Sequence, residues 1–163
     1  VLVTGHSLGG TAILYAAMLA DAGVLPSNMR VIVFGAPAFT QQNFQQRYPK
    51  LVSRITRVET EGDFLSYEKP GLMRPIYDTL NYIPLGKPIK AMAPEEYREL
   101  MKEREILLKQ YQASSSPESR ANYFNIMQKV IAMQSNIHVY SYRYFYEYYR
   151  RTQAANLTRN GDR

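Results

Sequence analysis

A serine set between glycines, in the spacing G-x-S-x-G, is the feature that most constrains this chain. The segment Gly5–Gly9 (GHSLG) follows a short apolar run at residues 1–3 (VLV) and precedes a helical pattern over residues 10–22. Small apolar side chains mark one face of that pattern: Ile13, Ala16, Ala17 and Ala20. Gly23 stands where such a helix would end. The pattern predicts a strand, a tight turn that holds Ser7, and a helix able to lie close to a sheet.

Two further apolar runs continue the alternation of strands and helical segments. Residues 29–37 (MRVIVFGAP) are largely apolar, which favours a strand buried on both faces of a sheet. Residues 54–63 (RITRVETEGD) carry a weaker strand pattern that ends in Gly-Asp. Strands separated by helical segments are typical of parallel sheets. We therefore predict an α/β fold with three or so parallel strands and added helices near residues 94–150.

The second half of the chain changes character. Residues 64–92 are interrupted by prolines and glycines and predict loop, with a short strand or hairpin near residues 82–91. Two helices are predicted next, one that begins at Ala93-Pro94 and one at Pro117. The tyrosine-rich residues 138–151 fit both a strand and a helix, and we favour the helix.

Both predicted helices carry an apolar stripe along one face. The stripe of the first consists of Tyr97, Leu100, Met101, Leu107, Leu108 and Tyr111. The stripe of the second consists of Tyr123, Ile126, Met127, Val130 and Ile131. Glu105 and Lys109 form a favourable pair one turn apart on the first helix.

Composition limits the classes of protein to which the chain can belong. Its 163 residues, 45% hydrophobic and 21% charged, suit one globular domain. The net charge of +6 comes from basic residues scattered among acidic ones, so we expect a solvated surface and no nucleic-acid partner. The absence of cysteine excludes disulfides and thiolate metal sites. We predict one domain over residues 1–153, with a helical insert at about 93–135, and a polar tail over residues 154–163.

Ser7 has the surroundings that a catalytic nucleophile needs. A serine hydroxyl attacks only when a neighbouring base removes its proton and hydrogen-bond donors stabilise the oxyanion that forms. The sharp turn exposes the serine, and Gly5 and Gly9 are expected to be glycine because a Cβ there would collide with the neighbouring strand and helix. The backbone N–H of Leu8, at the start of the helix, is expected to donate to the oxyanion.

The chain contains two histidines that could act as the base. His6 adjoins Ser7, and consecutive residues in a tight turn point in different directions, so we expect His6 to pack beside the turn. His138 lies late in the chain, where the order serine, acid, histidine requires the base. We predict that His138 is the general base.

Several carboxylates could orient that histidine. Catalytic groups in an open parallel sheet gather at the carboxyl ends of the strands. Asp63 follows the third predicted strand as Ser7 follows the first, so we expect the two to meet at one edge of the sheet. Asp78, in predicted loop, is the reserve candidate and Glu61 a weaker one. Asp21 lies at the far end of a helix.

These segments resemble the class 3 (fungal-type) lipases, a family with the α/β-hydrolase fold. Residues 3–10 (VTGHSLGG) are similar to the nucleophile turn of that family, and residues 31–39 (VIVFGAPAF) to its next strand. Residues 54–65 (RITRVETEGDFL) are similar to the strand that carries its catalytic aspartate, and residues 136–145 (NIHVYSYRYF) to its late histidine and tyrosine. The resemblance covers about the first 65 residues well and the segment around the histidine loosely.

The resemblance implies an esterase or lipase that acts on acyl esters without a metal or an organic cofactor. It implies Ser7 as the nucleophile, Asp63 as the orienting acid, His138 as the base and the N–H of Leu8 as one oxyanion donor. A lipid substrate, contact with a lipid interface, and secretion or a place in the cell envelope are family-level expectations.

The chain departs from the family pattern in three ways. The family's earlier strands and the loop with a second oxyanion donor would lie upstream of Val1, so we expect an excerpt with weak or no activity alone. The family's His-x-Gly is replaced by residues 84–86 (PLG). The two predicted helices between Asp63 and His138 are longer than expected there. They form either a packing insert, which we favour, or a lid over the acyl chain.

The residues leave the substrate open. The leading hypothesis is a serine carboxylester hydrolase that forms an acyl-enzyme. A thioesterase, a phospholipase A1 or an acyltransferase would use the same three residues. An alternative of another class is a non-catalytic α/β remnant that binds lipid or a partner through its tyrosine-rich end.

Overall fold

The computed structural model describes residues 2–24, 26, 28–67, 72–147 and 149–151. The strands are β1 (Leu2–His6), β2 (Arg30–Phe34), β3 (Ile55–Thr60) and β4 (Lys87–Ala91). The helices are α1 (Gly9–Asp21), α2 (Gln42–Arg47), α3 (Pro49–Val52), α4 (Arg74–Leu80), α5 (Glu95–Ser114) and α6 (Pro117–Val139). The tail predicted over residues 154–163 lies outside the described residues, as do the side chains of Ile13, Ala16 and Ala17.

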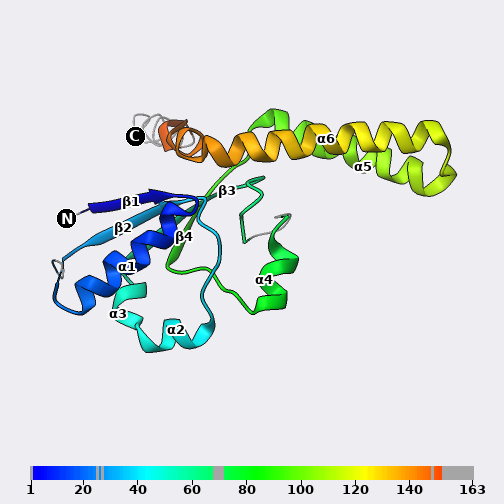
Figure 1. The fold of residues 1–163 in the computed structure, drawn as a ribbon. Helices are drawn as coiled ribbons and strands as arrows, with labels where there is room; N and C mark the ends of the chain where they lie inside the picture. Colours follow the sequence, from blue (N-terminus) through cyan, green and yellow to red (C-terminus); the bar gives the residue numbers. More distant parts are fainter. Residues whose placement is uncertain (1, 25, 27, 68–71, 148, 152–163) are drawn as a thin grey trace, which may run out of the picture.

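The four strands form one parallel sheet in the order β1-β2-β3-β4 (Figure 1). Gly5 of β1 is in register with Val33 of β2, which in turn is in register with Arg57 of β3. The predicted α/β class is therefore confirmed, with β4 as a fourth strand rather than a hairpin. β4 is hard to recognise in the sequence because it is a short, mostly exposed strand at the edge of the sheet, where Pro88 is tolerated.

One face of the sheet is covered by α1, α2 and α3, which lie below it in Figure 1. The residues buried between these layers are apolar, as burial on that face requires. They are Ala20, Met29, Val31, Val33, Ala36, Leu51, Ile55 and Leu85. Ala20 brings the last turn of α1 into this cluster, while Gly10 at the start of the helix lies close to Ala36, directly after the turn that holds Ser7.

The predicted loop over residues 64–92 contains a helix that the sequence pattern did not indicate. α4 has Pro75 in its first turn, where the missing N–H of proline costs nothing. The helix ends at Leu80 and is followed by Asn81, whose φ of 53° is left-handed. Its single buried side chain is that of Tyr77. The prolines that suggested loop thus partly mark the start of a short helix.

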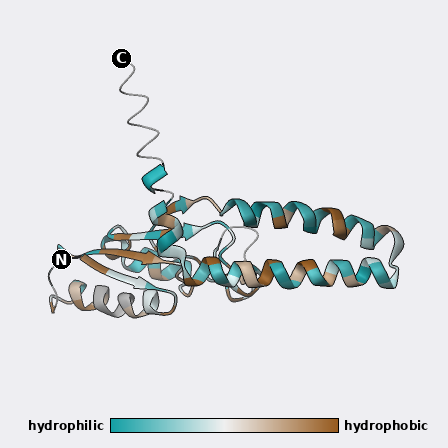
Figure 2. Ribbon diagram, turned by 90° about the horizontal axis from the view of Figure 1, so that it is seen from above, coloured by the Kyte–Doolittle hydropathy of each residue, from teal (hydrophilic) through white to brown (hydrophobic). Residues whose placement is uncertain are grey.

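α5 and α6 form a long antiparallel hairpin that projects beyond the sheet in Figure 1. Teal and brown alternate along both helices in Figure 2, as two amphipathic helices require. A small core of Ala93, Tyr97, Val130 and Ile137 fastens the base of the hairpin. The predicted pair Glu105 and Lys109 is present at 3.7 Å.

α6 extends further than the insert predicted to end near residue 135. It begins at Pro117, capped by the Ser116 hydroxyl, which accepts from the N–H of Ser119, and it ends at Val139. His138 therefore lies in its last turn rather than after it. Residues 141–147 are helical, as favoured for the tyrosine-rich segment. None of the described helices is long and apolar enough to cross a membrane.

Candidate active site

Ser7 occupies a strained turn between the end of β1 and the start of α1. Its φ of 56° lies in the left-handed region, which costs a residue with a side chain on the order of 1–3 kcal/mol. The turn is held on both sides, because Ser7 N–H donates to the carbonyl of Phe34 at 3.0 Å and Ser7 O accepts from Gly10 N–H at 2.9 Å. Backbone strain fixed by the surrounding structure is typical of functional positions.

The steric role predicted for Gly9 belongs instead to Gly10. A Cβ added at Gly9 would meet no atom within 4 Å, whereas one at Gly10 would lie 2.6 Å from the Cβ of Ala36. Gly10 is buried because α1 starts directly against the segment that follows β2. The prediction for Gly9 was wrong because Gly9 lies on the exposed side of the first helical turn.

The structure brings Ser7, His138 and Asp63 together from three separate elements. His138 Nε2 lies 3.0 Å from Ser7 Oγ, and His138 Nδ1 lies 3.0 and 3.1 Å from the two carboxylate oxygens of Asp63. Figure 1 shows the last turns of α6 above the carboxyl ends of β1 and β2, which is how residues far apart in sequence meet. Because a carboxylate only accepts, Nδ1 carries the proton and Nε2 is free to accept from the serine hydroxyl.

Asp63 is held rigidly in the turn that follows β3. Its side chain is almost fully buried, at 1% exposure. Its Oδ1 accepts from the N–H of Leu65 at 2.9 Å, in addition to the contact with His138. The rings of Phe64 and His138 pack edge to face, with 4.7 Å between their centroids. A carboxylate shielded from water in this way interacts more strongly with a cation beside it.

The other acidic candidates lie elsewhere in the structure. Asp78 is exposed on α4 and pairs with Arg74 at 2.8 Å. Glu61 is exposed and accepts from the N–H of Ala93 at 3.1 Å. Asp21 is at the exposed end of α1. The acceptor for His138 Nδ1 in the structure is Asp63.

The backbone of Leu8 is positioned as an oxyanion donor would be. Leu8 directly follows Ser7 and immediately precedes the first residue of α1. Among the described residues its N–H has no hydrogen-bond acceptor. The N-terminus of a helix favours negative charge, so a developing oxyanion beside Ser7 would be stabilised there. Leu8 itself is 71% exposed.

Gly35 is a residue of the site that the sequence patterns did not single out. It has a φ of 52°, and a Cβ added there would lie 2.6 Å from Asp63 Oδ2 and 3.1 Å from His138 Nδ1. The absence of a side chain at Gly35 thus leaves the space that the acid and the histidine fill. The available signal was a glycine at the end of β2, beside the strand that leads to Asp63.

Tyr77 supports the turn of Asp63 from α4. Its hydroxyl donates to the carbonyl of Leu65 at 3.0 Å, and Leu65 in turn donates to Asp63. The pKa of Tyr77 is raised to about 12, chiefly by burial; a hydrogen bond at Ala38 lowers it, and the nearby charges of Asp63 and Glu59 raise it. No pattern in the sequence marked Tyr77, because it lies in the region predicted as loop.

Replacing Tyr77 by phenylalanine should reduce the decrease in the free energy of unfolding that occurs as the pH rises from 10 to 12. The pKa of Tyr77 is about 12 when folded and about 10 when unfolded, so its contribution is complete below pH 10 and is lost as pH rises through 12. A pKa difference of two units corresponds to roughly 3 kcal/mol of unfolding free energy at most. Urea unfolding from pH 8 to 12 would measure this, with the exposed Tyr142→Phe as the control. An unchanged pH slope in Tyr77→Phe would contradict the expectation.

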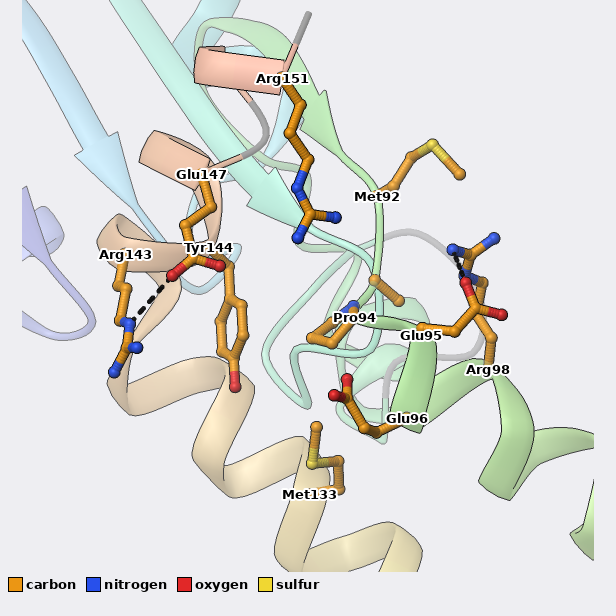
Figure 3. Close-up of a pocket in the computed structure, with 11 residues that line it drawn as sticks. Met92, Pro94, Glu95, Glu96, Arg98, Met133, Arg143, Tyr144, Glu147 and Arg151 are labelled. Atoms are coloured by element: carbon orange, nitrogen blue, oxygen red, sulfur yellow. Dashed lines mark hydrogen bonds and ion pairs between the residues drawn. The ribbon is translucent and has the colours of Figure 1, made fainter.

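A separate groove of about 650 Å³ lies between the start of α5, the C-terminal half of α6 and the helix that follows (Figure 3). Its charged residues are of both signs, and two ion pairs line it, Arg98 with Glu95 and Arg143 with Glu147. Neither Ser7, His138 nor Asp63 lines it. In the described part of the chain, no cluster of three histidine or acidic side chains is arranged to hold a metal ion.

Part of the chain matches a known protein family. Residues 1–68 match the family model described as lipase (class 3). That part runs from β1 to beyond the turn after β3 and includes Ser7 and Asp63, whereas His138 lies outside it. No curated protein matches the chain. The match indicates a lipase-type hydrolase in general terms.

Proposed function

Starting from the match of residues 1–68 to the class 3 lipases, we propose that this chain is a serine carboxylester hydrolase that cleaves acyl esters, with lipids as the substrate class. The observation that carries the proposal is the line of contacts from Ser7 Oγ through the His138 ring to the buried Asp63 carboxylate. Nucleophile, base and orienting acid in this geometry activate a serine for acyl transfer.

In the proposed acylation step, Ser7 Oγ attacks the ester carbonyl carbon while His138 Nε2 takes the hydroxyl proton. The carbonyl oxygen becomes an oxyanion, which accepts a hydrogen bond from Leu8 N–H. The resulting imidazolium is stabilised by the Asp63 carboxylate at 3.0 Å. When the tetrahedral intermediate collapses, His138 gives the proton to the departing alcohol and the acyl group remains on Ser7.

Deacylation repeats the same steps with water in place of serine. Water attacks the acyl carbon as His138 Nε2 takes one of its protons. Collapse of the second tetrahedral intermediate releases the carboxylic acid and returns the proton to Ser7 Oγ. In this proposal the groups that act in both halves of the cycle belong to a single domain over residues 1–153, in which the α5–α6 hairpin follows Asp63 and carries His138 in the last turn of α6.

A labelled fluorophosphonate tests the nucleophile without a choice of substrate. In the full-length protein, Ser7 Oγ should displace fluoride from phosphorus and form a stable phosphonate ester, which peptide mass spectrometry would locate. We expect labelling of wild type and of the Ser53→Ala control, an exposed serine whose hydroxyl donates to Lys50 O. Ser7→Ala should not be labelled. Equal labelling of Ser7→Ala and wild type would overturn the proposal.

A further inference from the structure

The two histidines of the chain contact each other through an interaction that the proposed chemistry does not use. His6 Nε2 lies 2.7 Å from the backbone carbonyl oxygen of His138. The two rings are 4.8 Å apart between centroids and tilted by 33°. His6 is the last residue of β1 and adjoins Ser7. The contact therefore joins the strand that carries the nucleophile to the helix that carries the base.

The partner of His6 defines its protonation. A carbonyl oxygen can only accept, so His6 Nε2 must carry a hydrogen and donate it. This donor meets a specific need, because the last carbonyls of a helix have no intrahelical N–H to accept from. His138 is in the last turn of α6, and its carbonyl accepts from His6 as well as lying beside the N–H of the C-cap residue Tyr140. His6 thus caps the end of α6 from another part of the chain.

We infer that His6 is a positioning residue, which holds the last turn of α6 against the serine turn so that His138 Nε2 stays within hydrogen-bond reach of Ser7 Oγ. The inference rests on the proposed function for its kinetic consequence. Its structural part, the fastening of α6 to β1, rests on the contact itself.

The need for such a fastening follows from how α6 is held. The buried side chains of the α5–α6 core are near the base of the hairpin, and most of its length projects beyond the sheet (Figure 1). A small rotation of α6 would move the His138 ring away from Ser7, although Asp63 would still hold its Nδ1. Misplacement of a catalytic group by about 1 Å lowers rates on the order of 100-fold.

Glutamine and asparagine provide a matched pair of variants. The side-chain amide of glutamine reaches about as far as the Nε2 of histidine, whereas that of asparagine reaches only to the Nδ1 position. We expect His6→Asn to lower kcat for ester hydrolysis by roughly 10- to 100-fold with KM nearly unchanged. His6→Gln should restore most of the loss. Thr4→Ala, at an exposed position of β1, should behave as wild type.

Hydrogen exchange gives a second readout that does not depend on activity. Backbone amides near the end of α6, such as that of Tyr140, should exchange faster in His6→Asn than in wild type or His6→Gln. Unchanged exchange in His6→Asn would overturn the inference even if the protein hydrolyses no ester. Equal kcat in His6→Asn and wild type would also overturn it, while Ser7 labelling of wild type would still support the proposed function. Restoration by His6→Phe but not by His6→Gln would assign the effect to ring packing and overturn the hydrogen-bond role.

Discussion

Ser7→Ala should lower kcat/KM for p-nitrophenyl esters by on the order of 10⁴-fold or more in the full-length protein. The hydroxyl at 3.0 Å from His138 Nε2 is the atom that would form the acyl bond, and alanine offers no substitute. Folding should be little affected, because alanine and serine meet the same strain at a φ of 56°. Initial rates with short and long acyl chains, together with circular dichroism, would measure both effects.

A double variant makes this expectation more specific. If Ser7 and His138 act as one unit, His138→Ala should be about as inactive as Ser7→Ala, and the double variant no worse than either. If the loss of activity in the double variant equalled the product of the two single losses, Ser7 and His138 would not act in one shared catalytic step. Turnover of Ser7→Ala equal to that of wild type would contradict the role of Ser7 altogether. In His138→Ala, His6 Nε2 cannot act as a substitute base while it carries a hydrogen and donates it to the carbonyl of residue 138.

The parts of the fold and site that the sequence could predict depend on local patterns and on chain order. The apolar runs identified β1, β2 and β3. Because parallel strands end at the same edge of a sheet, Ser7 and Asp63 could then be placed at that edge. His138 could be predicted as the base because the chain has only two histidines and His138 is the one that lies late in the sequence. The structure brings these three side chains together, and their catalytic roles stay predictions for the variants above to test.

The features that could not be predicted are contacts between segments far apart in the chain. His6 and the carbonyl of His138 are separated by 132 positions, and no local pattern reports such a pair. The same holds for Gly35, whose importance comes from side chains on two other elements. Gly9 and Gly10 are adjacent in sequence, and only the packing of α1 against Ala36 decides which of them must lack a Cβ.

Gly35→Ala should lower activity strongly while the protein remains folded. The new Cβ would lie 2.6 Å from Asp63 Oδ2, closer than real contacts allow, and 3.1 Å from His138 Nδ1. Asp63 is buried and held by Leu65 N–H, so it can move only by giving up a hydrogen bond. We expect kcat to fall by roughly 100-fold or more, because the base loses its orientation. Steady-state kinetics and urea unfolding would separate the activity loss from the stability loss.

Gly23→Ala is the matched control, because it separates the clash from the backbone strain. Gly23 also has a left-handed φ, of 77°, but a Cβ there meets no atom within 4 Å. Both variants should lose on the order of 1–2 kcal/mol of stability from the strained backbone, and only Gly35→Ala should lose activity. Gly9→Ala, with open space and no positive φ, should lose neither. If Gly35→Ala and Gly23→Ala kept the same kcat, Asp63 could not be the group that orients the base. An activity loss confined to Gly35→Ala would tie catalysis to the Asp63–His138 contact, since the strained backbone is common to both variants.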